Sequence, residues 1–484
     1  MSDITKQTLS ELVTNIKEKK LSSSEVTKAF VDRSEKSKEL NTYITEDFSN
    51  ALDKAKKFDD NPNLDLKLPG IPMAIKDLFC TANVRTTAGS KILNNFIPTY
   101  ESTVTQNIWN EGAILIGKLN CDEFAMGSSN ETSFFGNVQN PVGKDLVPGG
   151  SSGGSSSSLA ANLTPVTIGT DTGGSIRQPA SFTGTVGLKP TYGSCSRYGI
   201  VAFASSLDQA GPMTKDVKDC ALLLETISSY DKKDSTSVNF KRPNYLKELK
   251  KSIKGKKIGI PKEYKVDGMS KEIEDLWQKG INIIKKAGAQ VIDISLPNTN
   301  YALPTYYIVA PAEASSNLAR YDGVKYGFRS KGENLIDMYE KTRSEGFGNE
   351  VKRRIMIGTY VLSSGYYDAY YLKAQKVRNL IKSDFDEAYK KVDAILTPST
   401  PTSAFKIGEK TNDPVSMYLN DIFTVPVNLA GLPAISIPAG HDLKGYPLGL
   451  QIIGKPFDEQ NILNIAYTME EQIDFKNKIK DWWI

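Results

Sequence analysis

The chain has 484 residues, of which 39% are hydrophobic and 24% charged, an ordinary composition for a globular protein that buries a sizeable core. Its 60 basic and 56 acidic residues leave a net charge of only +4, which argues against a surface that wraps nucleic acid. Four widely spaced cysteines without a CxxC pair, together with one histidine, argue against a Cys/His zinc site and indicate a reducing cytosol.

The N-terminal residues are polar and include acidic side chains, so we expect no signal peptide. The longest apolar runs are far shorter than the roughly 20 residues that a membrane-spanning helix needs. We therefore expect a cytoplasmic protein that does not insert into a membrane.

Helix-capping signals open the chain. Residues 8–11 and 22–25 both have the Ser/Thr-x-x-Glu pattern of a capping box, and apolar residues follow each at helical spacing. We predict a helical N-terminal segment over residues 1–60 and a catalytic domain over residues 61–484.

Short apolar runs bounded by glycine and proline come next, and they are typical of buried strands. Helical stretches lie between them, which indicates an α/β sheet covered by helices on both faces. No internal repeat is visible, so we expect one large interleaved domain. The runs lie at residues 69–75, 113–117, 165–169, 257–261, 290–296, 392–398 and 433–438.

Two other regions have a different pattern. Residues 222–256 are charged and weakly patterned, and we expect an excursion from the domain there. Apolar spacing predicts one helix over residues 273–284 and further helix over residues 345–385, a stretch rich in tyrosine.

Two serine- and glycine-rich stretches, residues 148–155 and 170–179, carry the most information about function. Taken alone, the first is typical of a flexible linker. A linker would not lead into strand-like runs or be followed by a second Gly-Gly-Ser. A phosphate-binding P-loop is excluded because no Gly-Lys-Ser/Thr follows the glycines.

The lone histidine narrows the chemistry. A Ser-His-Asp hydrolase needs a placed imidazole, but His441 lies in a polar stretch that we expect to be a turn. Another base is required, and Lys76 is the best candidate. Ser175 would be the nucleophile and Ser151 would relay its proton, because a hydroxyl can donate and accept at once.

Glycines after a strand can turn several backbone N–H groups toward one point and so form an oxyanion hole. The residues expected to form it are Thr172, Gly173, Gly174 and Ser175.

Lys76 can act as a base only as a neutral amine. Its pKa would have to fall from about 10.4 to between about 7 and 8, and burial among apolar neighbours would lower it. The adjacent Asp77 would raise it, but neighbouring side chains on a strand point to opposite faces, so we expect Asp77 to point away.

Three motifs carry a family resemblance: Gly-Ile-Pro-x-x-x-Lys-Asp at residues 70–77, Gly-Gly-Ser-Ser-Gly-Gly-Ser at 149–155 and Asp-Thr-Gly-Gly-Ser-Ile-Arg at 171–177. With them the chain resembles the amidase signature family. The resemblance implies a single large α/β domain whose central mixed sheet is covered by helices on both faces. It also implies a Ser-Ser-Lys triad of Ser175, Ser151 and Lys76, with a cis peptide bond at Ser151.

Further stretches resemble a branch of this family that hydrolyses glutamine inside a tRNA-dependent amidotransferase. The resemblance implies that Tyr306, Arg354 and Asp421 line the glutamine pocket, although Tyr307 could face it instead of Tyr306. Without the resemblance, Arg354 would be taken for an exposed helix charge. The stretches lie at residues 124–133, 201–209, 345–355, 364–371 and 428–433.

The same resemblance implies partners. Ammonia would pass to a B subunit that holds ATP, magnesium and most of the tRNA contact, and a small C subunit would join them. This chain would need no metal or cofactor of its own. The alternatives are a free-standing amidase acting on small amides and a non-catalytic scaffold, and the presence of all three triad residues argues against the scaffold.

Overall fold

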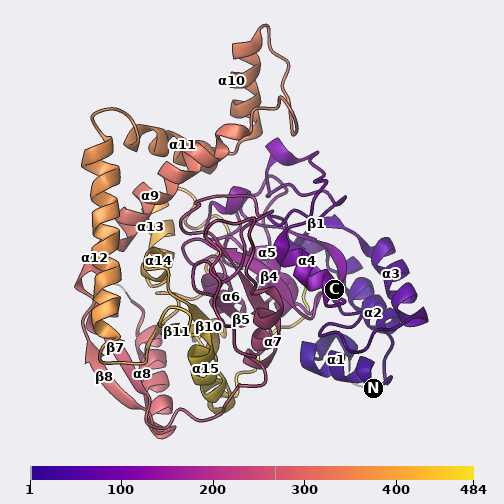
Figure 1. The fold of residues 1–484 in the computed structure, drawn as a ribbon, viewed down its shortest axis with the longest axis vertical. Coiled ribbons are helices and arrows are strands. Elements are labelled where there is room, and N and C mark those ends of the chain that lie inside the picture. Colours follow the sequence, from indigo (N-terminus) through magenta and orange to yellow (C-terminus); the bar gives the residue numbers. More distant parts are fainter. Residues whose placement is uncertain (1–2, 267–268) are drawn as a thin grey trace.

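A mixed sheet of 11 strands organises the chain, which the computed structural model describes over residues 3–266 and 269–484 (Figure 1). The strand order is β1-β3-β2-β4-β6-β5-β10-β11-β9-β7-β8. The pairs β2–β3, β2–β4, β7–β8 and β7–β9 are parallel and the other pairs are antiparallel. The strands are β1 Tyr43–Glu46, β2 Pro72–Lys76, β3 Ile114–Leu119, β4 Thr167–Asp171, β5 Val186–Lys189, β6 Gln209–Thr214, β7 Lys257–Pro261, β8 Gln290–Ile294, β9 Ala394–Pro398, β10 Ala434–His441 and β11 Pro447–Gly454.

Every residue of the central strands β2, β3 and β4 is buried, as expected for a sheet with helices on both faces. The predicted α/β fold is therefore confirmed. The helices are α1 Leu9–Lys17, α2 Ser23–Glu35, α3 Phe48–Asp60, α4 Thr103–Asn110, α5 Gly153–Ala160, α6 Arg177–Thr183, α7 Val217–Ile227, α8 Lys271–Lys286, α9 Ala302–Asn317, α10 Leu335–Gly346, α11 Asn349–Val361, α12 Lys373–Ala388, α13 Pro414–Tyr418, α14 Val425–Leu429 and α15 Glu459–Ile473.

Local sequence signals determine the N-terminal helices. Thr8 and Glu11 at the start of α1, and Ser22 and Glu25 at the start of α2, form the reciprocal hydrogen bonds of two capping boxes, so this prediction is confirmed. The N-terminal segment also supplies β1, which pairs with β3 at one edge of the sheet. Its division from the rest of the chain stays a prediction.

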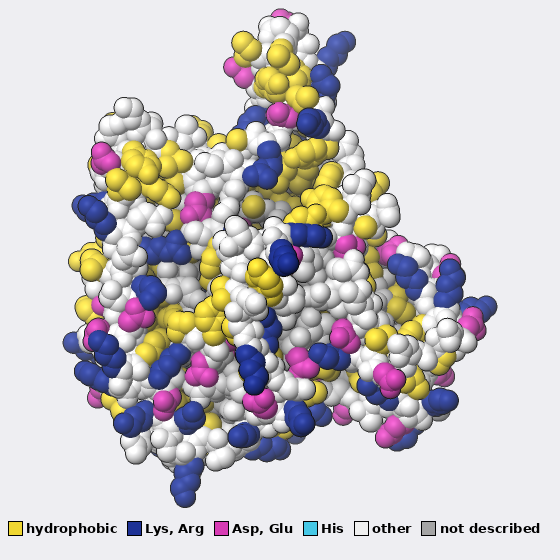
Figure 2. Space-filling view, in the orientation of Figure 1, with side chains coloured by type: hydrophobic (Ala, Val, Ile, Leu, Met, Phe, Trp, Pro, Cys, Tyr) yellow, Lys and Arg dark blue, Asp and Glu magenta, His cyan; other side chains and the backbone are white. Residues whose placement is uncertain are grey.

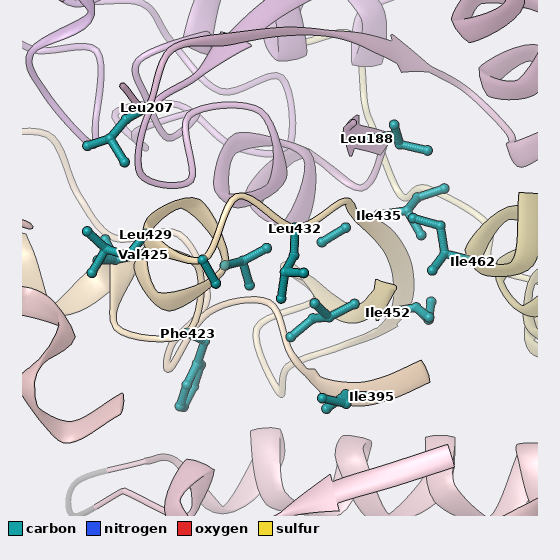
Figure 3. Close-up of a cluster of buried hydrophobic side chains, with 14 of the residues drawn as sticks. Leu188, Leu207, Ile395, Phe423, Val425, Leu429, Leu432, Ile435, Ile452 and Ile462 are labelled. Carbon is teal, nitrogen blue, oxygen red and sulfur yellow. The ribbon is translucent and has the colours of Figure 1, made fainter. Parts of the chain in front are cut away.

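The largest hydrophobic core lies between the C-terminal strands and the helices that cover them. Figure 3 shows Ile395 of β9, Ile435 of β10, Ile452 of β11 and Ile462 of α15 in this cluster. All four side chains are fully buried, and each burial stabilises the fold by roughly 1.5–3 kcal/mol. The apolar runs predicted as strands thus form the sheet, each within a few residues of its expected position.

Three expectations need correction. α7 continues to Ile227, so residues 222–227 are helix, and an excursion over the residues that follow stays a prediction. The polar turn begins after His441, which is the last residue of β10 and stacks on Phe475. The helix expected over residues 345–385 is broken at residues 347–348, between α10 and α11, and again at residues 362–366, after which a π-helical turn, Tyr367–Leu372, leads into α12.

Positive and negative side chains are interspersed over the face shown in Figure 2, in keeping with the small net charge. The same view shows α10 projecting from the body of the molecule. Within the described residues, no helix is both long enough and apolar enough to span a membrane.

Candidate active site

The amine of Lys76 lies among three hydroxyl groups at the end of β2. Its Nζ is 2.8 Å from Ser151 Oγ, 2.8 Å from Ser152 Oγ and 2.9 Å from Thr170 Oγ1. An ammonium group has three N–H donors, so these three oxygens satisfy it completely. A neutral amine has a lone pair instead of the third N–H and can accept a proton from one of the hydroxyls.

Burial decides the protonation of this lysine. The Lys76 side chain is 0% exposed, and this burial lowers its pKa to about 8, while the more distant Cys121 and Asp122 act to raise it. The predicted fall in pKa is therefore confirmed. Asp77 points away, as expected, and instead bonds Thr87 and lies 3.4 Å from Lys118.

The segment that carries Ser151 passes closely over its neighbours. The peptide bond between Gly150 and Ser151 is cis, which confirms the prediction. A Cβ atom on Gly150 would lie only 2.1 Å from Asp122 Oδ2, so only glycine fits there. The Ser152 N–H donates to the Ser175 carbonyl at 3.2 Å, which places the segment beside the expected nucleophile.

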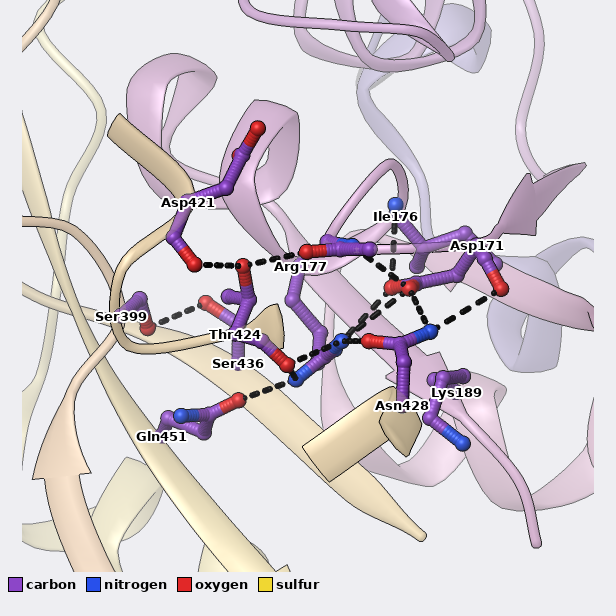
Figure 4. A network of polar contacts seen from close by, with 12 residues as sticks. Asp171, Ile176, Arg177, Lys189, Ser399, Asp421, Thr424, Asn428, Ser436 and Gln451 are labelled. Atoms are coloured by element: carbon purple, nitrogen blue, oxygen red, sulfur yellow. Dashed lines mark hydrogen bonds and ion pairs between the residues drawn. The ribbon is translucent and has the colours of Figure 1, made fainter. Parts of the chain in front are cut away.

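An ion pair supports the loop that carries Ser175 (Figure 4). Asp171, the last residue of β4, accepts hydrogen bonds from Gly174 N at 2.8 Å and from both Nε and a terminal nitrogen of Arg177 at 3.0 Å. Asn428 donates to the same carboxylate at 2.9 Å. Burial acts to raise the pKa of Asp171, but Arg177 overcomes it and lowers the pKa to about 2.

This ion pair reduces the number of N–H groups that are available to form the oxyanion hole. The N–H of Gly174 is already bonded to Asp171, so Thr172, Gly173 and Ser175 supply the remaining candidate donors. Gly174 has φ +141°, and a Cβ there would lie 2.3 Å from Thr424 Oγ1. The glycine is required because Thr424 packs directly against the loop and donates to the Gly173 carbonyl at 2.7 Å.

A cavity of about 480 Å³ is lined by residues from segments 123–132, 349–354 and 410–418, and none of the described residues that line it belongs to the loop that carries Ser175. Arg354 lines it and is only 3% exposed, so it is not a surface charge. Its Nε donates to Glu350 at 2.8 Å, while its two terminal nitrogens make no hydrogen bond with any described residue. The rings of Tyr307 and Tyr418 lie 5.4 and 5.8 Å from the guanidinium carbon. Two free, parallel donors in such a setting suit a carboxylate.

Asp421 presents a carboxyl group nearby. Its Oδ2 accepts a hydrogen bond from Ser128, another residue of the cavity wall, whereas its buried Oδ1 has no partner among the described residues. Oδ1 is 3.3 Å from the position that a Cβ on Gly174 would take, and so lies next to the loop of residues 172–175, which carries the expected nucleophile and is called the nucleophile loop below. Burial raises the pKa of Asp421 to about 7, and a bound cation would restore the carboxylate.

The two adjacent tyrosines occupy different places. The Tyr306 ring contacts the nucleophile loop, since a Cβ on Gly173 would lie 2.8 Å from Tyr306 Cζ. Tyr307 stacks on Tyr418 with 3.8 Å between ring centroids. Tyr306 is thus the one against the loop, and Tyr307 belongs to the aromatic wall beside Arg354.

Sequence reasoning missed several residues that the fold brings to the site. Ser152 and Thr170 bond Lys76, and Ser128 bonds Asp421. Only Glu350 carried a usable signal, because it lies four residues before Arg354 on a helix and such pairs face each other. Across residues 3–266 and 269–484, no group of three or more His, Cys, Asp and Glu side chains could hold a metal ion.

Comparisons with known proteins identify the family to which the chain belongs. Residues 25–463 match the family model described as "Amidase". The chain is 85% identical to the A subunit of glutamyl-tRNA(Gln) amidotransferase from Pelagibacter ubique, and the match covers 100% of both chains. It is 39% identical to the crystal structure of the A subunit from Thermotoga maritima, with a TM-score of 0.81 and 99% of each chain covered. A peptide amidase of Stenotrophomonas maltophilia is 28% identical, with a TM-score of 0.82 and 98% of each chain covered.

Proposed function

This chain belongs to the amidase family, and we infer that it is the glutamine-hydrolysing subunit of a glutamyl-tRNA(Gln) amidotransferase. Relatives that bear this name match the chain over its whole length, one of them at 85% identity. The structural observation that carries the chemistry is the buried contact of 2.8 Å between Lys76 Nζ and Ser151 Oγ.

Glutamine binds by its amino-acid end. The two free terminal nitrogens of Arg354 grip the α-carboxylate, and the unpaired Oδ1 of Asp421 accepts from the α-ammonium. Tyr306 packs against the nucleophile loop at Gly173. These three residues direct the side-chain amide toward Ser175, which is 8% exposed.

Ser175 Oγ attacks the amide carbon of the glutamine side chain. Ser151 takes the hydroxyl proton of Ser175 and passes its own proton to the neutral amine of Lys76. Backbone N–H groups of the nucleophile loop stabilise the oxyanion, each contributing about 3–4 kcal/mol.

The tetrahedral intermediate then collapses. The proton returns from Lys76 through Ser151 to the amide nitrogen, and the C–N bond breaks. Ammonia departs, and the γ-glutamyl group remains attached to Ser175 as an ester. Water attacks this ester with the same base, which releases glutamate and restores the Ser175 hydroxyl.

The ammonia is used elsewhere in the complex. A partner B subunit binds ATP, magnesium and the tRNA, activates the glutamate carried by tRNA(Gln), and combines it with ammonia. A small C subunit completes the assembly. Because the final substrate is a charged tRNA, we expect the complex to work in the cytoplasm.

The decisive experiment measures glutamate release from glutamine by the chain alone and with its B and C partners, Glu-tRNA(Gln) and ATP. We expect a large rise that coincides with formation of Gln-tRNA(Gln). Partner-independent release, or fast turnover of simple amides without use of glutamine, would instead indicate the free-standing amidase.

Ser175→Ala tests the nucleophile. We expect glutamine-dependent amidation by the complex to fall by about 10⁴-fold or more, while free ammonia still supports it. Ser155→Ala is the matched control, because Ser155 lies on the neighbouring helix and its hydroxyl bonds, among the described residues, only the Ile168 carbonyl. Loss of both the glutamine and the ammonia routes in Ser175→Ala would mean that Ser175 serves assembly.

A further inference from the structure

Two segments that are far apart in the sequence meet at the rim of the glutamine pocket. The carboxylate of Glu123, just after β3, accepts a hydrogen bond from the Gly348 N–H at 2.8 Å. The ring of the next residue, Phe124, contacts the ring of Phe347, with 5.7 Å between centroids. Two consecutive residues of one segment therefore join two consecutive residues of the other, directly before α11 begins at Asn349.

We call these contacts between residues 123–124 and 347–348 the joint, and Ser90 also takes part in it. It donates to the second carboxylate oxygen of Glu123, and its Oγ also lies 3.4 Å from the Gly346 carbonyl. Glu123 is only 2% exposed, so both oxygens are used inside the protein. A buried carboxylate with this many partners has one defined position.

The joint sets the position of α11. Gly348 is the N-cap of this helix, where a carboxylate is favoured by the free N–H groups and the helix dipole. The same helix carries Glu350 and Arg354 within its first two turns. Fixing its first turn therefore fixes the guanidinium that faces the cavity.

The Glu123 side of the joint connects to Asp421, which would bind the α-ammonium group of glutamine. The Glu123 N–H donates to Thr132 Oγ1 at 3.1 Å, and Thr132 bonds Asp122 at 2.9 Å, which closes the loop between them. Ser128 lies in this loop and donates to Asp421. Glu123 thus connects two parts of the pocket. One is α11, which carries Arg354 toward the α-carboxylate; the other is the loop of Ser128, which orients Asp421, the partner of the α-ammonium.

The backbone at this point needs external support. Phe124 and Ala125 have φ angles of +49° and +61°, in the left-handed region that non-glycine residues avoid. Contacts of the Phe124 ring with Phe347 and Tyr321 hold the first of them in place. Without the joint, both the loop and the helix would be free to shift.

We propose that Glu123 is a positioning residue for glutamine, which fixes the start of α11 to the loop of Ser128 and so holds Arg354 and Asp421 at the spacing of an amino-acid backbone. The proposal rests on the proposed function, because it assumes that the cavity takes glutamine. Glu123 acts through these neighbours and takes no part in the transfer of protons at Ser175.

The test compares the kinetics of glutamine-dependent amidation by the assembled complex. With Glu123→Ala we expect the KM for glutamine to rise about tenfold, because the hydrogen bonds of a buried carboxyl group to Ser90 and Gly348 are lost, with kcat within about twofold of wild type. Glu123→Gln keeps an acceptor for Gly348 and a donor for Ser90, so its KM should stay within about threefold of wild type. Amidation with free ammonia should be unchanged in both, which also shows that the complex is intact.

Glu263→Ala is the matched control. Glu263 makes the same kind of contacts, accepting from the Ser295 hydroxyl and from the Leu296 N–H at 2.8 Å, but it lies beside β7 and β8, away from the pocket. We expect its KM for glutamine to equal that of wild type. An equal rise in KM for this variant would mean that the effect is general loosening of the fold.

Gly348→Ala approaches the joint from its other side. A Cβ on Gly348 would lie 2.4 Å from Glu123 Oε2, so the alanine should displace the carboxylate and raise the KM as Glu123→Ala does. This variant decides the matter if Glu123→Ala does not assemble.

The outcomes separate the two proposals. A wild-type complex that uses ammonia but not glutamine would overturn the proposed function. A glutamine-using wild type whose KM is unchanged in Glu123→Ala or, should that variant not assemble, in Gly348→Ala, would overturn the positioning role. A fall in kcat at constant KM would also overturn it, since a positioning residue for binding should not slow the chemistry alone.

Discussion

Side chains on the two faces of β4 contact two buried cations, one through a hydroxyl group and the other through a carboxylate. Thr170 turns its side chain toward Lys76, and its neighbour Asp171 turns toward Arg177. Both cationic side chains are 0% exposed. Among the described residues, Lys76 hydrogen-bonds only to neutral hydroxyls and its pKa falls to about 8, whereas Arg177 pairs with the Asp171 carboxylate, whose pKa is lowered to about 2. Burial is the same on both faces, so Lys76, a buried amine without a paired carboxylate, is the one that can lose its proton, while Arg177 stays charged and holds the Asp171 carboxylate in its ionised form.

Of the substitutions that test this comparison, removal of the Lys76 amine should have the largest effect. Lys76→Met keeps the length of the side chain but has no base, so we expect glutamine hydrolysis to fall by about 10²–10⁴-fold. Amidation from free ammonia should persist because the partner's site is untouched. The measurement is glutamate release by the complex, and retained activity would exclude Lys76 as the base.

Breaking the ion pair on the other face should cost stability. Asp171→Asn leaves the Arg177 guanidinium buried without a counter-charge, and we expect a loss of about 3–5 kcal/mol in the free energy of unfolding. Denaturant unfolding measures this loss. The control is Asp32→Asn, which removes an exposed pair with Lys28 and should cost no more than about 0.5 kcal/mol. Equal losses would contradict the role given to burial.

The substitution with the smallest expected effect is Thr170→Val, which tests how one hydroxyl contributes to the pKa of Lys76. In the proposed mechanism Lys76 acts as a neutral amine, so kcat/KM for glutamine should rise with pH and level off above about 8. Thr170→Val removes one oxygen that accepts from the ammonium form, which disfavours that form and lowers the pKa. The rising limb of the pH profile should move about one unit toward acid, as loss of a hydrogen bond to a charged group implies. A limb that stays in place or moves to higher pH would show that Thr170 does not set the pKa.

Much of the fold could be predicted because its signals are local. Capping boxes mark the starts of α1 and α2, and short apolar runs mark the strands. The errors fell at the boundaries of elements. Residues 222–227 are apolar except for Glu225 and Thr226 and finish α7, and His441 is polar yet ends β10 because it pairs with Pro447 of β11.

The candidate site was predicted unevenly for the same reason. Lys76 and the two glycine-rich segments are readable because a cluster of glycines beside serines is unusual in a strand-and-helix pattern. Ser152, Thr170 and Ser128 are ordinary polar residues in the sequence. Their roles depend on contacts between residues that lie 76 to 293 positions apart in the chain, which no local pattern encodes.

By itself, the sequence determined the class of fold, the absence of a histidine base and the segments that carry the hydroxyls and the amine. These follow from residue type and short spacing. Only the tertiary structure decided that Lys76 is fully buried among three hydroxyls, that Arg354 faces a cavity, and that Asp171 pairs with Arg177. Burial and partner charge set the protonation of each group, and both are properties of packing between distant segments.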